Sequence, residues 1–315
     1  MKPIYILLII VLLVIFMIAI LVNQIANMII YPERLTYERI AMEMAKRLKY
    51  SDAEVAELLA IPYEEFTLQS NYGYPIVGRI FDFKGENNII LLHRESRNLI
   101  ASYKFLRMYR DLGFNVVMFD ARYHGKSGGS NYTYGYFERW DLKLVTDHVL
   151  EKLGDVGMLG FHGESGGAAT ALLTLSVDPR VDFAIADSSF TDLLEVMRNL
   201  EENFLHTKSK KLLMVIDQVV KRKAGYSLEN VSPLTEIQAM EIPVLFIHSQ
   251  ADQIVPNKMS KTLKSFKSGY NDIYIAKDAP HLMGYYLHTA EYEAKVRDFV
   301  KHLNDHYKKY GKTFQ

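Results

Sequence analysis

The sequence contains no cysteine, and this absence removes several kinds of chemistry at once. Disulfide bonds, thiol nucleophiles and cysteine-based metal sites are all excluded. The ten histidines show no His-Glu-x-x-His spacing or comparable ligand pattern, so we predict no metal site and no cofactor. A chain without cysteine also suits a protein that faces an oxidising exterior.

A net charge is also missing, because Lys+Arg and Asp+Glu both number 37. With no basic cluster to attract phosphates, the sequence predicts no nucleic-acid partner. It has no internal repeat and no low-complexity segment. Since 49% of the 315 residues are hydrophobic and 23% are charged, the chain can bury a large core and is not a disordered protein.

One long apolar run opens the chain. Ile4 to Val22 carries no charge, and apolar character continues to Ile30 with only three amide side chains between. At about 1.5 Å per residue, the charge-free run reaches roughly 28 Å, enough to cross the hydrocarbon core of a bilayer. A cleaved signal peptide would have a shorter apolar region and a small-residue cleavage site. We therefore expect residues 1–30 to form an uncleaved transmembrane anchor.

The charges on either side of this run favour opposite orientations. Lys2 marks the N-terminal tail as cytoplasmic, whereas several basic residues follow the run and would favour a cytoplasmic body. These are Arg34, Arg39, Lys46, Arg47 and Lys49. We expect a single-pass protein of the cell membrane, with the tail inside and the body outside.

Residues 31–62 predict a helical neck, in which Ser51 and Glu54 form a capping box. We interpret it as a stalk between the bilayer and the body.

From residue 63 the pattern changes to strands. Phe66–Leu68 and Tyr74–Phe83 flank an Asn-Tyr-Gly turn and predict an antiparallel hairpin.

Buried strands then alternate with helices as far as residue 308, followed by a tail at 309–315. This alternation predicts an α/β fold with a mostly parallel central sheet and helices on both faces. In such sheets ligands bind at the carboxyl ends of the strands. The predicted strands are Ile89–Leu92, Val116–Phe119, Val156–Phe161, Val181–Ala186, Pro243–Ile247 and Ile273–Ile275, and the predicted helices are Leu99–Leu112, Trp140–Leu153 and a closing helix through Tyr292 and Leu303.

An insertion interrupts the alternation between Asp187 and Pro243. Two segments, Asp192–Phe204 and Ser209–Lys223, are apolar on more than one helical face. A helix of this kind must bury both faces, so we predict a small helical cap over the functional edge of the sheet, at about residues 189–235. Ordinary crossover helices are the alternative.

The most informative motif is Gly163-Glu164-Ser165-Gly166-Gly167, between an apolar strand and a helix rich in small residues. A sharp strand–turn–helix places the serine at the apex, beside backbone N–H groups at a helix start. Alone, the motif could be a glycine-rich turn with an incidental serine. A serine hydroxyl also needs an adjacent base and an orienting carboxylate to become a nucleophile.

Both partners are present in the expected places. Asp252 follows the strand at Pro243–Ile247, and His281 follows the last strand. The order Ser165, Asp252, His281 is that of the α/β-hydrolase triad. Asp278, three residues before His281, is the alternative acid.

Further matching stretches are His93–Asn98, Phe119–Gly129 and Val231–Leu234. With the serine, aspartate and histidine motifs, they make residues 63–308 resemble bacterial α/β-hydrolases of the prolyl-oligopeptidase-like serine hydrolase group. More narrowly, the chain resembles the membrane-anchored hydrolases of Gram-positive bacteria. The resemblance implies the α/β-hydrolase fold, with Ser165 as nucleophile, Asp252 as acid and His281 as base.

The chain departs from that family at the oxyanion loop, where the family usually has His-Gly-x. Here the residues are His93-Arg94-Glu95. If the backbone needs a positive φ at the second position, Arg94 is strained by about 1–2 kcal/mol. We expect the backbone N–H of Gly166 to be the first oxyanion donor and that of Glu95 the second.

Other polar residues near these motifs have structural interpretations. We expect His124 to support the loop after its strand, and His162 and His248 to be structural. Glu164 receives no chemical role. The tyrosines at 132, 134 and 136 either line a substrate cleft or belong to a partly exposed loop.

We therefore predict a hydrolase that cleaves an ester or amide bond through an acyl-enzyme intermediate, with a small ester or short peptide as substrate and the bilayer as partner. A serine peptidase is one alternative, and an impaired hydrolase-fold binding or scaffold protein at the membrane is another. Haloalkane or epoxide chemistry on this fold uses a carboxylate nucleophile, which Ser165 argues against. The natural substrate and the oligomeric state do not follow from the sequence.

Overall fold

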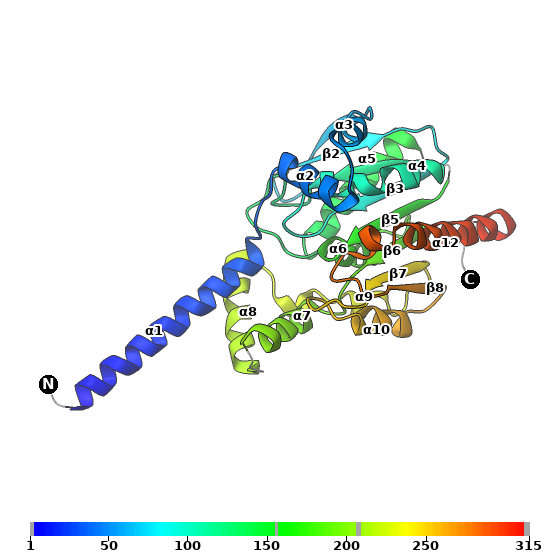
Figure 1. Cartoon of the computed structure of the whole chain (residues 1–315). Helices are drawn as coiled ribbons and strands as arrows, with labels where there is room; N and C mark the ends of the chain where they lie inside the picture. The colour runs from blue at the N-terminus through cyan, green and yellow to red at the C-terminus, as the bar shows by residue number, and fades with distance from the viewer. Residues whose placement is uncertain (1–2, 155–156, 206–208, 312–315) are drawn as a thin grey trace.

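A twisted eight-stranded sheet forms the centre of the computed structural model, which describes residues 3–154, 157–205 and 209–311 (Figure 1). The strand order is β1-β2-β4-β3-β5-β6-β7-β8. The pairs β1–β2 and β2–β4 are antiparallel, and all other neighbours are parallel. The predicted hairpin and mostly parallel sheet are confirmed. The strands are β1 Glu64–Gln69, β2 Pro75–Phe81, β3 Asn87–Leu92, β4 Phe114–Phe119, β5 Leu159–Glu164, β6 Phe183–Asp187, β7 Val244–Ser249 and β8 Asn271–Ala276.

Helices cover both faces of the sheet because successive side chains of each buried strand point to opposite faces. Ile89 and Leu91 of β3 belong to one apolar cluster with residues of α12, whereas Ile90 belongs to a second cluster with residues of α5 and α6. The helices of the body are η1 Leu99–Phe105, α4 Leu106–Asp111, α5 Glu138–Leu153, α6 Gly166–Thr174, α10 Lys258–Phe266, α11 Gly284–Leu287 and α12 Thr289–Tyr310.

Two predicted elements differ in detail. The helix expected at 99–112 begins as a 3-10 helix, η1, capped by Asn98, whose side chain accepts the N–H of Ile100 at 3.1 Å. It becomes α-helical only from Leu106. The predicted start of the fifth strand at Val156 lies outside the described residues, as do Lys2 and most of the predicted C-terminal tail.

The neck packs on the body. Its helices are α2 Tyr37–Leu48 and α3 Asp52–Leu59, with the predicted capping box at Ser51. Ile40 and Met44 are each 2% exposed and join the cluster on the α12 side of the sheet. The Tyr37 hydroxyl also donates a hydrogen bond to the buried carboxylate of Asp120. The interpretation of this segment as a stalk is therefore wrong, because its apolar face is part of the body's core.

The apolar N-terminal run forms α1 Pro3–Ile30, which projects away from the body (Figure 1). In the described part of the chain, it is the one helix long and apolar enough to cross a membrane. Its last turns do not project, because Val22, Ala26, Ile29 and Ile30 are buried in a third apolar cluster.

The predicted cap supplies most of that third cluster. The cluster joins the end of α1 and the cap to Ala169 and Leu173 of α6, the helix that follows Ser165. The elements of the cap are α7 Leu193–Leu200, the π-helical turn η2 Glu201–Leu205, α8 Lys210–Ala224, η3 Leu228–Asn230 and α9 Pro233–Ile237. Helices α7 and α8 pack in this third cluster, whereas Ile237 of α9 belongs to the sheet-face cluster that contains Ile90, so the cap over the sheet edge stays a prediction.

Candidate active site

Ser165 occupies a strained turn between β5 and α6. Its backbone has φ +50° and ψ −115°, a conformation that residues other than glycine rarely adopt. The Ser165 N–H donates to the Asp187 carbonyl at 2.8 Å, and its own carbonyl accepts the N–H of Ala169 at 2.9 Å. These bonds to the neighbouring strand and the following helix hold the turn in place, so strain is maintained at the residue expected to react.

The flanking glycines are required by close backbone approach. A Cβ on Gly163 would lie 2.3 Å from the Gly167 carbonyl oxygen, and one on Gly167 would lie 2.6 Å from the His93 carbonyl oxygen. Both distances are far below a normal contact. The glycine positions of the motif thus follow from the packing of β5, α6 and the loop after β3.

Asp252 and His281 are in direct contact. Oδ2 of Asp252 lies 2.5 Å from Nδ1 of His281, and Oδ1 of Asp252 accepts the N–H groups of Ile254 and Val255, each at 2.9 Å. Burial opposes ionisation of Asp252, but hydrogen bonds from His248 and His281 lower its pKa to about 2. The carboxylate is therefore ionised at neutral pH and can only accept hydrogen bonds.

This contact sets the tautomer of His281. Because the Asp252 carboxylate only accepts, Nδ1 of His281 carries a proton, and in the neutral imidazole the lone pair is therefore on Nε2. Nε2 is buried and has no hydrogen-bond partner among the described residues. Ser165 lies at the same carboxyl edge of the sheet, but the described residues include no hydrogen bond between its hydroxyl and His281. In structures without substrate, such a bond is often long.

The alternative acid is not placed to act. Asp278 is exposed, and its backbone N–H donates to Oε1 of Gln250 at 3.0 Å. Asp252 is therefore the carboxylate that orients His281.

The oxyanion loop differs from expectation. The Glu95 side chain, through Oε2, accepts the Gly166 N–H at 3.4 Å, and Oε1 lies 3.4 Å from Nη1 of Arg94. A positive φ occurs at Ser96 (+58°) and not at Arg94, so the strain considered for Arg94 is absent. Arg94 therefore pairs with Glu95. The Glu95 carboxylate in turn accepts the N–H of Gly166, which is the expected first oxyanion donor.

Two buried histidines shape this loop. His93 accepts the Ala121 N–H at Nε2 (2.9 Å) and donates from Nδ1 to the Arg94 carbonyl (2.8 Å). His124 accepts the Ser96 N–H at Nε2 (3.1 Å) and donates from Nδ1 to the Arg122 carbonyl. Burial lowers the pKa of His93 to about 4 and that of His124 to about 3, so both are neutral. The structural role expected for His124 is confirmed.

The remaining two histidines named from the sequence also have structural partners. His162 lies between the hydroxyls of Tyr109 and Tyr292, at 2.8 and 3.0 Å, and burial lowers its pKa to about 3. His248 contacts the Ser260 hydroxyl at 2.6 Å and lies 3.3 Å from Oδ2 of Asp252. It therefore supports the acid as well as the core.

Sequence reasoning missed a buried ion pair directly before the nucleophile. Nζ of Lys104 lies 2.5 Å from Oε1 of Glu164, and both side chains are almost fully buried. Burial disfavours the Lys104 ammonium, but attraction to Glu164 raises its pKa above the ordinary value. A glutamate at the end of an apolar strand was the one available indication, because a buried carboxylate needs a partner. No pattern in the sequence identifies Lys104 as that partner.

The tyrosine segment borders the oxyanion donor. Tyr132 is 1% exposed, and a Cβ on Gly166 would lie 2.6 Å from its hydroxyl oxygen. The Tyr132 N–H donates to the carbonyl of Ile30, the last residue of α1, at 3.0 Å. Tyr132 is therefore buried beside Gly166, the residue after Ser165, and does not belong to an exposed loop.

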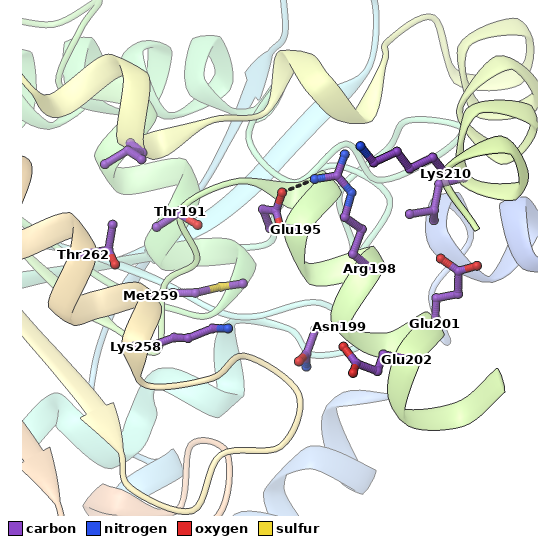
Figure 2. Close-up of a pocket in the computed structure, with 12 residues that line it drawn as sticks. Thr191, Glu195, Arg198, Asn199, Glu201, Glu202, Lys210, Lys258, Met259 and Thr262 are labelled. Atoms are coloured by element: carbon purple, nitrogen blue, oxygen red, sulfur yellow. Dashed lines mark hydrogen bonds and ion pairs between the residues drawn. The ribbon is translucent and has the colours of Figure 1, made fainter. Parts of the chain in front are cut away.

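A cavity of about 420 Å³ lies between the cap and α10 (Figure 2). Asn199, on the cap, donates from its amide to the carbonyls of Gln253 and Ile254, so the cavity adjoins the loop that carries Asp252. Most of its lining is polar, including an ion pair between Arg198 and Glu195. The lining residues are Thr191, Glu195, Arg198, Asn199, Glu201, Glu202, Lys210, Leu213, Leu234, Lys258, Met259 and Thr262.

The chain is similar to known proteins of one hydrolase family. The profile of the prolyl oligopeptidase family matches residues 102–306. The Bacillus subtilis (strain 168) protein YqkD is 36% identical over 243 residues, which cover 76% of this chain and 80% of that protein. The Arabidopsis thaliana α/β-hydrolase domain-containing protein WAV2 is 25% identical over 246 residues, covering 75% of this chain and 76% of WAV2.

Solved structures with low identity share the fold. The Pyrococcus furiosus esterase Pf2001 superposes with a TM-score of 0.63 at 22% identity, covering 78% of this chain and 94% of the esterase. The Pyrococcus horikoshii acylaminoacyl peptidase gives 0.60 at 15% identity, covering 80% of this chain and 43% of that protein. The arrangement is that of an α/β-hydrolase fold.

Proposed function

The chain belongs to the prolyl oligopeptidase family of α/β-hydrolases and is a serine hydrolase, and from that premise we propose that it cleaves a carboxylic ester through an acyl-enzyme intermediate. Ser165 is the nucleophile, His281 the base and Asp252 the acid. The observation that carries the proposal is the 2.5 Å contact between Asp252 and Nδ1 of His281, because it leaves Nε2 as the ring nitrogen available to act as a base. The strained backbone of Ser165 supports the same assignment.

In the proposed reaction, Nε2 of His281 takes the Ser165 proton as Oγ attacks the acyl carbon. Asp252 stabilises the imidazolium that forms, and the proton then passes to the leaving alcohol. Water, activated by the same histidine, hydrolyses the acyl-enzyme. The backbone N–H of Gly166 is one oxyanion donor and that of Glu95 the second. The Glu95 carboxylate must leave the Gly166 N–H before an oxyanion can bind there.

A serine peptidase is the second candidate, because one structural neighbour is named an acylaminoacyl peptidase. We favour an ester because the cavity beside the Asp252 loop, between the cap and α10, is only about 420 Å³, which suits a small substrate group better than an extended peptide. Matched ester and amide substrates decide between the two.

We further propose that α1 anchors the protein in the cell membrane, with the hydrolase body on the outer side. The length and apolar composition of α1 support the anchor. The absence of cysteine supports an outer location. Protease added to intact spheroplasts should then degrade the body, whereas protection until lysis would reverse the orientation.

The function is tested with a fluorophosphonate label and a series of nitrophenyl esters on the full-length protein. Wild type should be labelled and active, whereas Ser165→Ala should lose both properties and keep its fold. Ser249→Ala is the matched control, because Ser249 is a buried serine at the same sheet edge whose hydroxyl has no partner among the described residues. An unlabelled, inactive wild type would favour the binding or scaffold protein instead.

A further inference from the structure

The end of α1 is built into the body beside the nucleophile. Val22, Ala26, Ile29 and Ile30 are buried, whereas Pro3–Leu21 are all exposed. At about 1.5 Å per residue, the exposed part is about 28 Å long, close to the roughly 30 Å thickness of the hydrocarbon core. The buried part of α1 therefore begins at the position where the helix would leave the hydrocarbon core of a bilayer.

The partner of these buried turns is cap helix α8. The two helices pack side by side, and Nζ of Lys223 donates to the Asn27 side chain at 2.7 Å (Figure 1). If α1 spans a bilayer, this contact holds α8 at the level of the headgroups. The cap is then the part of the body that lies at the membrane surface.

The free face of α8 has the composition that such a position requires. Met214 is 67% exposed and Val215 is 51% exposed. The other exposed residues of α8 are basic or amide side chains, and its acid, Asp217, is buried and bonded to Ser227 and Leu228. A helix with apolar and basic residues on its free face binds the interface of an anionic bilayer. These other exposed residues are Lys210, Lys211, Gln218, Lys221, Arg222 and Lys223.

Packed residues connect this surface to the segment that carries Ser165. Ile30 holds the backbone of Tyr132, whose hydroxyl lies beside Gly166. The same apolar cluster includes Ala169 and Leu173 of α6. If α1 spans a bilayer, Ser165 therefore lies on the body side of the contact between α1 and the cap.

We propose that α8 and the last turns of α1 form a surface that contacts an anionic bilayer, and that the site takes its acyl ester from that bilayer. This inference rests on the proposed ester hydrolysis and membrane anchoring. It adds that the cap is a membrane-contacting element and that the substrate is a lipid-soluble ester.

The contact is tested without reference to activity. Because the chain has no cysteine, Met214→Cys carries a single environment-sensitive NBD label, and Met42→Cys is the matched control. Met42 is 63% exposed on α2, which packs against the body. In vesicles of phosphatidylcholine and phosphatidylglycerol, the label at 214 should shift to the blue and be quenched by spin-labelled lipid, and the label at 42 should not. Equal emission at both positions would overturn the contact.

The substrate class is tested with a long-chain acyl ester dissolved in the vesicles and a soluble short-chain ester. The double variant Met214→Asp, Val215→Asp should lose about tenfold or more on the vesicle ester and keep its rate on the soluble one, and Met42→Asp should keep both. Equal loss on both esters, or no loss, would overturn the proposed route. If wild type hydrolyses neither ester, the proposed function fails and the substrate inference with it, while the NBD label still decides the membrane contact.

Discussion

Oε2 of Glu95 accepts the backbone N–H of Gly166 at 3.4 Å, on the donor that a tetrahedral oxyanion would use. A carboxylate and an oxyanion cannot both accept from that N–H, because like charges repel. Under the proposed function, the Glu95 side chain therefore closes the oxyanion hole in this structure. Arg94, paired with the other oxygen of Glu95, is placed to hold the carboxylate when it moves.

Replacing Glu95 tests this arrangement. Glu95→Gln keeps the size of the side chain and removes its charge, so kcat on a neutral ester should rise, by up to about tenfold or 1.4 kcal/mol. Steady-state kinetics at saturating ester measure it, with Glu57→Gln, on the surface of α3, as control. A fall of about a hundredfold would show instead that the carboxylate takes part in the reaction.

The buried pair of Lys104 and Glu164 predicts a stability effect. Lys104→Met leaves an unpaired carboxylate and Glu164→Gln an unpaired ammonium, so each should lower the free energy of unfolding by about 3–5 kcal/mol. The double variant should lose less than the sum of the two. Urea unfolding in detergent measures this, and Lys152→Met, which breaks an exposed pair with Glu64, should leave the midpoint nearly unchanged. Additive losses would contradict direct coupling.

Three neutral buried histidines predict sensitivity to acid. The folded pKa values of His93, His124 and His162 are about 4, 3 and 3, below the ordinary 6.5. Below about pH 6.5 the unfolded chain therefore binds protons that the folded chain does not, and stability falls as the pH drops towards the folded values. Each histidine contributes up to about 1.4 kcal/mol per pH unit in that window.

Urea midpoints between about pH 7 and pH 5 measure this slope. His162→Gln should reduce it by roughly a third, whereas His302→Gln, on the exposed side of α12, should not change it. Asp252 acts in a different window: its pKa is lowered to about 2, so its stabilising contribution is lost only below its ordinary value of 3.8. A slope that is unchanged by His162→Gln would mean that this histidine titrates normally.

The features predicted correctly from the sequence are those that local stereochemistry controls. The turn at Asn71–Gly73 specifies the hairpin, and continuous apolar runs specify buried parallel strands. The glycines around Ser165 predict an apex serine because no side chain fits between Gly163, Gly167 and the His93 carbonyl. Each of these features leaves a local pattern in the sequence, although the approach of the His93 carbonyl to Gly167 is visible only in the structure.

Contacts between distant residues were decided by the tertiary structure. Lys104 meets Glu164 across 60 positions because β3 and β5 are neighbours in the sheet. Tyr132 meets the end of α1, whose last turns pack in the third apolar cluster. Neither pairing leaves a periodic pattern in the sequence. The neck shows the same limit, since its amphipathic helix predicts an apolar face but not the surface that covers it.

The sequence by itself determined the kind of chemistry: an apex serine, an aspartate and a histidine after successive strands, and an apolar run long enough to span a bilayer. The tertiary structure decided which groups contact each other in the candidate site and where that site lies relative to α1. In the folded chain, the Glu95 carboxylate accepts the Gly166 N–H. The end of α1 packs against the cap and against α6, the helix that follows Ser165. The physical reason is that side-chain identity fixes what a residue can do, whereas burial and long-range packing fix which partner it meets.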